Sequence, residues 1–522
     1  MKVEQHEDAR LIERADVPQH LDGRRIQMLG AAHVDIDALE AVGDRPLEDR
    51  HDLRAREPRR QRLQQLQDAL LVAAFDDDER NSRAQDDFEL VRGVGGSGGG
   101  GQWRRHAAGT LANVFLESAP SMNANPKRRP APLPLPEWID PFTPAEVERL
   151  ASEFGSPLLV IDCERVRTQY RRLAAALPRV DLHYALKPLP APAVVAALAE
   201  AGSFFDLATS GEVDVVRNAK IAPERCIHTH PIKRDRDIRD ALDYGVTIFV
   251  ADNPDEIRKF TKFRERAALL LRVSFRSPDA VCDLSRKFGC DPEAVPALLK
   301  LARDLGIRVR GLSFHVGSQA ADPAKYIEAT RVCRDLLAAA TAAGLGSFDM
   351  LDIGGGFPVD YGKPVMPIEE FCAPIRAELA TLPQGMRVIA EPGRYIAAPA
   401  AIGIATVMGR AHREGRWWYY LDDGLYGSYS GQLYDHARYP VDSLRGGKRL
   451  PSVLAGPTCD SIDVVNDHID LPELRAGDLV VGRMMGAYTW ASATDFNFFP
   501  KARLVAVNLT PGDRGSVVDL NR

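Results

Sequence analysis

The sequence predicts an α/β fold followed by a smaller β domain, and three observations support this. From residue 157 to residue 395, short apolar runs rich in β-forming residues alternate with helical stretches. Such alternation is typical of a parallel sheet, either doubly wound or closed as an (α/β)8 barrel. After about residue 398, runs such as IGIATVMGR and DLVVGRM are separated by turns without clear helices, which predicts an antiparallel β domain. A hydrophobic fraction of 45% over 522 residues leaves room for two or three domains.

The first 121 residues differ from all that follow. They contain no tyrosine, no cysteine and one lysine, Lys2, but many arginines. The run GVGGSGGGGQ that starts at Gly93 matches a dinucleotide fingerprint by letter, but the preceding FELVR is a poor strand, so we interpret the run as a flexible linker. We expect residues 1–121 to be disordered. A mistaken extension, with the true start at Met122, is the alternative that the sequence leaves open.

Three segments follow the extension. Residues 122–155 form a lead-in that includes the proline-rich PAPLPLPEW, and a contribution of this lead-in to the β domain is left open. We expect the barrel over 156–397 and the β domain over 398–522. The expected strands of the parallel sheet are, in order, PLLVID (157–162), DLHYALK (181–187), FFDLAT (204–209), CIHTHP (226–231), TIFVAD (247–252), LLLRVSF (269–275), GLSFHVGS (311–318), MLDIGGGF (350–357) and RVIAEPGRY (387–395).

Composition excludes several classes of protein. The formal net charge of −6 provides no overall basic field for nucleic acid or an anionic membrane, so a small molecule is the expected partner. There is no apolar stretch of about 18 residues and no apolar core typical of a secretory signal at the amino end. The seven cysteines are scattered without a C-x-x-C pair, which indicates neither a disulfide framework nor a metal site. We expect a cytoplasmic protein.

Unusual polar residues cluster at the carboxyl ends of the expected strands. Barrel enzymes place their sites at these ends because the loops there converge. We therefore expect one pocket. The residues concerned are Lys187, Asp206, His315 with Ser318, Gly354, Gly355 and Gly356, and Glu391 with Arg394.

Each of these residues also has an ordinary structural interpretation. A lone lysine such as Lys187 often lies at the surface, a glycine run often serves only a tight turn, and His315 by itself is typical of a hydrogen-bonded core histidine. A desolvated lysine can also form an imine, and successive small residues let backbone N–H groups approach an anion. Taken together, an amine, an anion nest, an arginine, a carboxylate and a flat imidazole are the groups that pyridoxal phosphate requires.

Seven ordered motifs carry a family resemblance: YALK, SFHVGSQ, DIGGGFP, EPGRY, YDH, GPTCDS and GAYT. With them, residues 140–522 resemble the fold-type III pyridoxal-phosphate decarboxylases, in the ornithine decarboxylase branch. The resemblance implies an alanine-racemase-like (α/β)8 barrel, a carboxyl-terminal β-barrel domain, and a homodimer whose active sites lie at the interface.

The resemblance also implies a role for each motif residue. Lys187 would bind the cofactor as an imine and Cys459, from the other subunit, would protonate the substrate Cα. Glu391 would keep the pyridine nitrogen protonated. The remaining implied contacts are His315 stacked on the ring; Ser318, Gly354, Gly355, Gly356, Arg394 and Tyr488 at the phosphate; Asp206 and Arg272 elsewhere on the cofactor; and Tyr434, Asp435 and Asp460 at the substrate.

The expected reaction is the decarboxylation of L-ornithine to putrescine, a step of polyamine biosynthesis, and other readings stay open. L-Lysine is one methylene longer, which discriminates by only about 1 to 3 kcal/mol. A meso-diaminopimelate enzyme would have a Glu-Ser-Gly signature where this chain has Cys459, Asp460 and Ser461. A catalytically inactive homologue that acts as a binding protein is a further alternative, and Pro188 and His230 depart from the family pattern.

The pairing of Cys459 with Asp460 favours a thiol that gives a proton away. A neighbouring carboxylate disfavours the thiolate by repulsion between like charges. We therefore expect Cys459 to act as a proton donor and Asp460 to bind the distal amine of the substrate.

Overall fold

The computed structural model describes residues 142–275, 286–512 and 516–521. The expectations for residues 1–121, and for the lead-in up to residue 141, lie outside the described residues. All candidate site residues lie within them.

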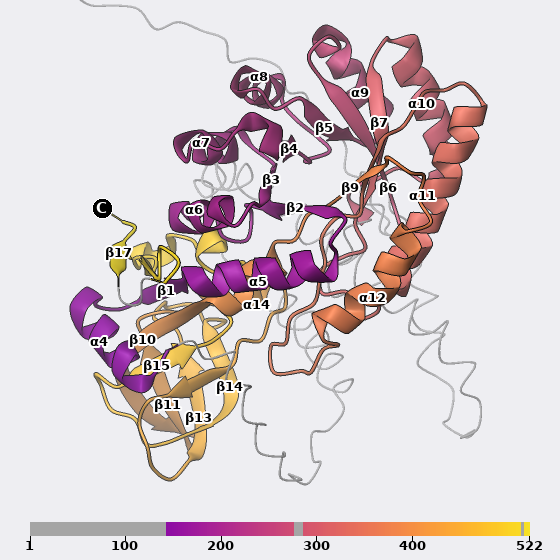
Figure 1. Ribbon diagram of the computed structural model, residues 1–522. Coiled ribbons are helices and arrows are strands. Elements are labelled where there is room, and N and C mark those ends of the chain that lie inside the picture. The colour runs from indigo at the N-terminus through magenta and orange to yellow at the C-terminus, as the bar shows by residue number, and fades with distance from the viewer. Residues whose placement is uncertain (1–141, 276–285, 513–515, 522) are drawn as a thin grey trace, which may run out of the picture. The chain divides into compact units, whose positions relative to one another are not determined.

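Eight parallel strands close into a barrel, which confirms the (α/β)8 prediction over the doubly wound alternative (Figure 1). Each strand pairs with its successor, and the last pairs with the first through Leu182 and Ala390. The barrel strands are β2 (Val180–Ala185), β3 (Phe204–Leu207), β4 (Cys226–His228), β5 (Ile248–Ala251), β6 (Ala268–Val273), β7 (Arg308–Phe314), β8 (Met350–Asp352) and β9 (Arg387–Ala390).

Helices alternate with the barrel strands along the chain, the first of them preceding β2, and lie around the outside of the barrel (Figure 1). Several begin at a side-chain cap, since Asp162, Thr209 and Asn253 accept hydrogen bonds from the first turns of their helices. The helices are α5 (Cys163–Ala176), α6 (Pro192–Glu200), α7 (Ser210–Asn218), α8 (Asp235–Tyr244), α9 (Pro254–Lys259), α10 (Val295–Asp304), α11 (Ala324–Ala342) and α12 (Ile368–Leu379), with short 3₁₀ turns η3 (Pro223–Arg225), η4 (Phe260–Phe263) and η6 (Pro292–Ala294).

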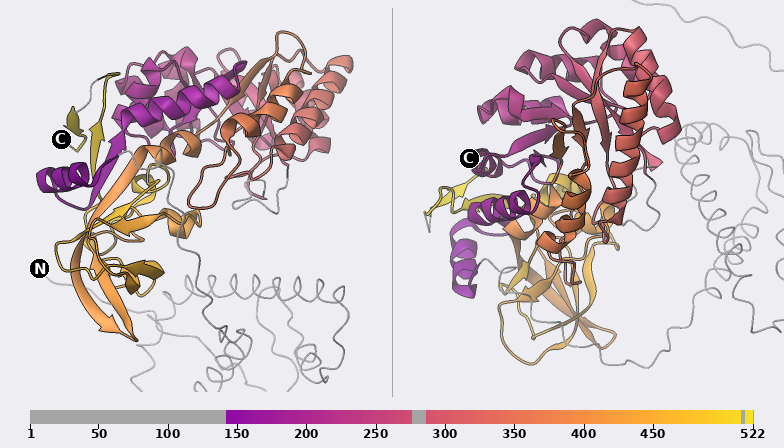
Figure 2. Two further views of the ribbon diagram at one scale, coloured as in Figure 1. Left: turned by 60° about the horizontal axis from the view of Figure 1, so that its bottom comes forward. Right: turned by 45° about the vertical axis from the view of Figure 1, so that its right-hand side comes forward.

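A second, mostly antiparallel sheet forms the separate β domain, as expected; Figure 2 shows it from two further sides. The exceptions are the parallel pairs β1–β16 and β11–β13. Its strands are β1 (Leu158–Asp162), β10 (Ala401–Arg413), β11 (Arg416–Leu421), β12 (Val441–Ser443), β13 (Leu450–Ala455), β14 (Val464–Leu471), β15 (Leu479–Gly482), β16 (Arg503–Val507) and β17 (Val517–Asp519). Helices α4 (Pro144–Phe154), α13 (Arg394–Ala397) and α14 (Gly431–Tyr434) and the turns η7 (Ala398–Ala400), η8 (Trp490–Ser492) and η9 (Phe496–Phe498) complete the described elements.

Strand β1 differs from the expectation that residue 156 opens the barrel. It pairs antiparallel with β10, Leu158 facing Ile404, and parallel with β16. All five of its residues are buried, and a strand buried on both faces has the same apolar pattern in either sheet. The closed barrel therefore begins at Val180.

Apolar clusters fill the interior of each part. Val147 and Leu150 of α4 pack in one cluster with Leu158 and Ile402 of the β domain. A small cluster that includes Ile227, Val250 and Leu270 joins side chains from neighbouring barrel strands. No helix of the described ranges has the length and apolar character needed to cross a bilayer.

Candidate active site

Lys187 and Asp206 meet at the ends of the first two barrel strands. The Lys187 ammonium lies 3.7 Å from Asp206 Oδ2, and Asp206 also accepts a hydrogen bond from the Thr229 hydroxyl. Burial opposes the charge of Lys187, but Asp206, then Tyr488 and Glu391, raise the pKa of Lys187 above its usual range. The Lys187 side chain is 44% exposed in the single chain, so solvent moderates the burial effect and the neighbouring charges decide the direction.

Three buried carboxyl groups lie at or next to the carboxyl ends of strands β3, β8 and β9. Asp206, Glu391 and Asp352 are at most 8% exposed. Burial, followed by repulsion from Glu391, raises the pKa of both Asp206 and Asp352 well above the usual range. The Glu391 N–H donates to Gly354 O at 2.8 Å, which ties Glu391 to the turn after β8. Burial and repulsion both favour the protonated forms of Asp206 and Asp352.

The glycine turn after β8 is pressed against the neighbouring strand. A Cβ on Gly354 would lie 2.3 Å from Phe314 O, and one on Gly356 would lie 2.2 Å from Gly317 O. Both glycines have positive φ, 68° and 109°, which side chains disfavour. Gly355 is equally confined, because its Cβ would lie 2.5 Å from Glu391 O. Only glycines fit at these three positions.

His315 is held as a flat, neutral ring beside this turn. It is 8% exposed, and its Nδ1 accepts a hydrogen bond from Gly317 N–H at 3.1 Å. Burial, with a smaller effect from Arg272 and Lys187, places the pKa of His315 well below its usual range. A neutral imidazole in this position can pack against a planar ligand without charge repulsion.

Arg394 forms the anion-binding corner of the site. Its guanidinium donates to Ser318 Oγ at 3.1 Å and to the Tyr361 hydroxyl at 3.0 Å, forms an ion pair with Asp435, and lies 4.8 Å from the centroid of the Tyr488 ring. An arginine that is 6% exposed and faces hydroxyl groups is suited to a phosphate. Sequence reasoning missed Tyr361, which follows the glycine turn in a loop that no local pattern marks.

Arg272 lies near the end of β6. Its guanidinium carbon is 5.6 Å from the centroid of the Phe288 ring, and Phe288 in turn meets His230 edge to face at 5.5 Å. The unusual residue His230 is therefore linked to Arg272 through one aromatic ring.

The loop GPTCDSID (456–463) is held by hydrogen bonds to the side chain of its last residue, Asp463. The Asp463 carboxylate is buried and accepts hydrogen bonds from Leu425 N–H at 2.7 Å and from Thr458 N–H at 3.0 Å. Cys459 is exposed, and Asp460 accepts a hydrogen bond from the Tyr426 hydroxyl, which lowers the pKa of Asp460. Among the described residues, no hydrogen bond or ion pair joins Cys459 or Asp460 to a barrel strand.

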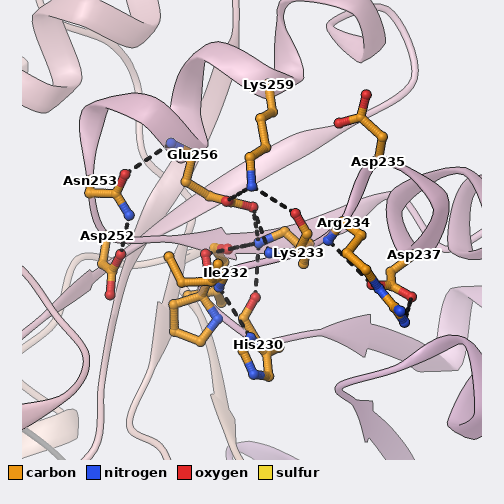
Figure 3. Close-up of polar contacts among 12 residues, drawn as sticks. His230, Ile232, Lys233, Arg234, Asp235, Asp237, Asp252, Asn253, Glu256 and Lys259 are labelled. Carbon is orange, nitrogen blue, oxygen red and sulfur yellow. Dashed lines mark hydrogen bonds and ion pairs between the residues drawn. The ribbon is translucent and has the colours of Figure 1, made fainter. Parts of the chain in front are cut away.

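A buried ion pair locks the barrel rim beside the site (Figure 3). Lys233 Nζ lies 3.0 Å from Glu256 Oε1, with both side chains at most 1% exposed. Lys233 Nζ also donates to Val250 O at 2.6 Å, and Glu256 receives Lys259 Nζ at 2.6 Å. Burial outweighs the pairing and lowers the pKa of Lys233 to about 8. The rim network thereby ties the loop after β4 to strand β5 and helix α9. A hollow of about 470 Å³ adjoins it, lined in part by Thr209, His230 and Lys233.

The structure brings most of the predicted site together and leaves a smaller part outside. Lys187, Asp206, His315, Ser318, Glu391, Arg394 and Tyr488 converge with the glycine turn at the carboxyl end of the barrel, together with Asp435. Cys459 and Asp460 lie on loops of the β domain, and the Tyr434 side chain is exposed. The barrel group has the amine, the anion corner, the buried carboxylate and the flat ring that pyridoxal phosphate needs, so the residues present fit this cofactor.

The fold and this group of residues define a barrel enzyme of the pyridoxal-phosphate class, and comparisons with known proteins agree. The family model described as "Pyridoxal-dependent decarboxylase, pyridoxal binding domain" matches residues 163–398. The chain belongs to the ornithine decarboxylase family of fold-type III pyridoxal-phosphate decarboxylases. Pyridoxal phosphate is therefore confirmed as its cofactor.

Three relatives illustrate this membership. The chain is 39% identical over 355 residues to a lysine/ornithine decarboxylase of Selenomonas ruminantium, covering 68% of this chain and 90% of the relative. It is 33% identical to an ornithine decarboxylase of Caenorhabditis elegans, covering 67% and 86% of the two chains. The structure of a Vibrio vulnificus lysine/ornithine decarboxylase complexed with putrescine has 52% identity and a TM-score of 0.68, covering 71% of this chain and 100% of that one.

Proposed function

We propose that this protein decarboxylates L-ornithine to putrescine and carbon dioxide. The chain belongs to the ornithine decarboxylase family, and one observation carries the proposal: Lys187, Glu391 and Arg394 with its hydroxyl partners converge at one end of the barrel. The Vibrio vulnificus relative, whose structure holds putrescine, supports the choice of substrate.

The barrel residues act by holding the cofactor and directing its reactivity. When bound, pyridoxal phosphate supplies an electron sink for the pair left on the substrate Cα. Arg394, Ser318 and the glycine turn would hold the phosphate of the cofactor, and the Lys187 amine would hold its aldehyde carbon. Glu391 would hold a proton on the pyridine nitrogen, which would strengthen the sink, while Asp206 orients Lys187 through the contact at 3.7 Å.

The carboxylates of the β domain select the substrate. Asp435, which pairs with Arg394 in the single chain, and Asp460, with Tyr434 beside them, bind the distal ammonium of a basic amino acid and repel the distal carboxylate of diaminopimelate. Tyr426 supports this role because its hydrogen bond keeps Asp460 ionised. L-Lysine, which adds one methylene, is a second substrate, and the Selenomonas and Vibrio relatives, both lysine/ornithine decarboxylases, favour it.

Cys459 completes the reaction by giving its thiol proton to the substrate Cα after carbon dioxide leaves. We assign Cys459 and Asp460 to the site of a partner subunit, so that the active unit is a homodimer. Two facts support this assignment: these residues make no polar contact with the barrel strands among the described residues, and large apolar side chains near them, Tyr434, Ile462 and Phe498, are 52% to 95% exposed.

A cytoplasmic location is part of the same proposal. All six described cysteines are free, which suits a reducing compartment.

The test is carbon dioxide release from L-ornithine, L-lysine, L-arginine and meso-diaminopimelate, measured side by side on the purified protein. We expect the highest kcat/KM for L-ornithine, followed by L-lysine. Preference for diaminopimelate would overturn the roles of Asp435 and Asp460, and a protein that binds no cofactor would instead support the inactive homologue.

A further inference from the structure

The loop after Thr489 brings an asparagine directly against the Cys459 thiol. Asn497 Oδ1 lies 3.2 Å from Cys459 Sγ and 3.2 Å from Cys459 N. Because the Cys459 backbone N–H is a donor, the atom facing it must be the carbonyl oxygen of the amide and not its NH₂ group. The same oxygen therefore accepts from the S–H group.

Asn497 reaches this position through a backbone conformation that few residues tolerate. Its φ is 53° and its ψ is 15°, in the left-handed region where asparagine and glycine are favoured. The loop is anchored on both sides of this turn. Thr494 N–H donates to Tyr426 O at 2.8 Å, and the Phe496 ring stacks on the Tyr426 ring with centroids 4.4 Å apart.

Tyr426 contacts both the loop that carries Asn497 and the Asp460 carboxylate. Its ring supports the loop that carries Asn497, while its hydroxyl holds Asp460. Cys459 and Asp460 are thus held by different partners, although they are adjacent in sequence. The hydroxyl contact draws the carboxylate toward Tyr426, and the amide contact orients the thiol.

We propose that Asn497 is a positioning residue that orients the Cys459 S–H group and stabilises its protonated form until it delivers the proton. This inference rests on the proposed role of Cys459 as donor. The proton passes from Sγ to the substrate Cα, which holds the electron pair left by carbon dioxide. The resulting thiolate takes up a proton from solvent before the next turnover.

Three variants of the full-length holoenzyme separate this role from a structural one. Asn497→Gly removes the amide but accepts the left-handed backbone without strain. Asn497→Asp keeps an acceptor oxygen and adds a negative charge. Asn508→Gly is the matched control, because Asn508 also has a left-handed φ of 54° but its side chain bonds to Asp162, away from the thiol.

The first measurement is the rate of Cys459 alkylation by iodoacetamide as a function of pH, without substrate, read from the modified peptide. Loss of the acceptor frees the thiolate, so we expect Asn497→Gly to react about threefold faster than the unmodified protein below the midpoint of the pH profile. Asn497→Asp should react more slowly than the unmodified protein, because its carboxylate repels the thiolate, and Asn508→Gly should not differ. Equal rates for Asn497→Gly and the unmodified protein, or faster reaction of Asn497→Asp, would overturn the proposal. So would an increase in Asn508→Gly equal to that in Asn497→Gly.

The second measurement is the ratio of pyridoxamine phosphate formed to carbon dioxide released during turnover of L-ornithine. We expect this ratio to rise about threefold in Asn497→Gly and to stay nearer the original value in Asn497→Asp. If the ratio rises in Cys459→Ala but stays unchanged in Asn497→Gly, the inference about Asn497 is wrong. An unchanged ratio in Cys459→Ala contradicts the donor role itself, and the alkylation series still decides whether Asn497 holds the thiol.

Discussion

The barrel rim and the β-domain loops supply two halves of the site, and they are held in different ways. On the rim, Asp206, Glu391 and Arg394 are at most 8% exposed and are fixed by strand ends and by neighbouring backbone. On the β domain, Cys459 is exposed and is held by one asparagine side chain. We therefore propose that the cofactor half is complete within one chain, whereas the substrate half reaches its place only when two chains assemble.

The largest effect is expected from Lys187→Ala on the rim. Loss of the attaching amine should reduce kcat for L-ornithine by more than about 10³-fold. It should also abolish the absorption band of the bound cofactor that borohydride removes. Lys300→Ala, at an exposed lysine on helix α10, is the control and should keep both signals. A Lys187→Ala protein with a borohydride-sensitive band would show that another amine attaches the cofactor.

A smaller effect of another kind is expected from Cys459→Ala on the β domain. Because general acid catalysis contributes about 10²- to 10⁴-fold, we expect kcat to fall by about 10²-fold while cofactor content stays unchanged. The ratio of pyridoxamine phosphate to carbon dioxide should rise, since the proton then reaches the wrong carbon more often. Loss of the cofactor band in this variant would break the proposed division between the two halves.

Asp460→Asn tests whether the β-domain loops bind the substrate. Hydrogen bonds to charged groups contribute about 1.5 to 3 kcal/mol, so KM for L-ornithine should rise by about 10- to 100-fold with a smaller change in kcat. Steady-state kinetics on L-ornithine measure this. An unchanged KM for L-ornithine would mean that Asp460 does not bind the distal ammonium.

The smallest effect on catalysis is expected from Glu256→Gln in the rim network, which should act on stability. Removal of one partner from a buried ion pair typically lowers the free energy of unfolding by about 3 to 5 kcal/mol. Denaturant unfolding of the apoprotein measures this loss. KM for L-ornithine should change little, because Glu256 contacts Lys233 and Lys259 rather than the site. A large change in KM with unaltered stability would assign Glu256 to substrate binding.

The same network predicts a dependence of stability on pH. The pKa of Lys233 is about 8 in the folded protein and about 10.4 when unfolded, so between these values the unfolded chain binds more protons. Stability attributable to Lys233 should therefore rise with pH above 8, and the penalty for its buried charge should be present in full below pH 8. The difference in unfolding free energy between Lys233→Met and the unmodified protein, followed from pH 7 to pH 9.5, tests the sign. A difference that does not change with pH would contradict it.

The barrel and its strand-end residues were predictable because their signals are local. Apolar strands that end in Lys187 or Glu391 show both the strand and the polar residue in a few consecutive letters. Strand β1 was assigned to the barrel domain because its pairing with β10 and β16 depends on segments more than 200 residues away. Tyr361, Asn497 and the Lys233–Glu256 pair were missed for the same reason, since each acquires its role from a contact that only the folded chain creates.

Mixing Lys187→Ala and Cys459→Ala subunits tests most directly whether the two halves of one site come from two chains. Each variant alone is nearly inactive in our account. After dissociation and random reassociation at equal amounts, half of the dimers are mixed, and each of these has one site with both residues intact. We predict recovery of about a quarter of the original rate of carbon dioxide release. If mixing restored no activity above the two parents, Lys187 and Cys459 would belong to the same subunit's site, and the account would be wrong.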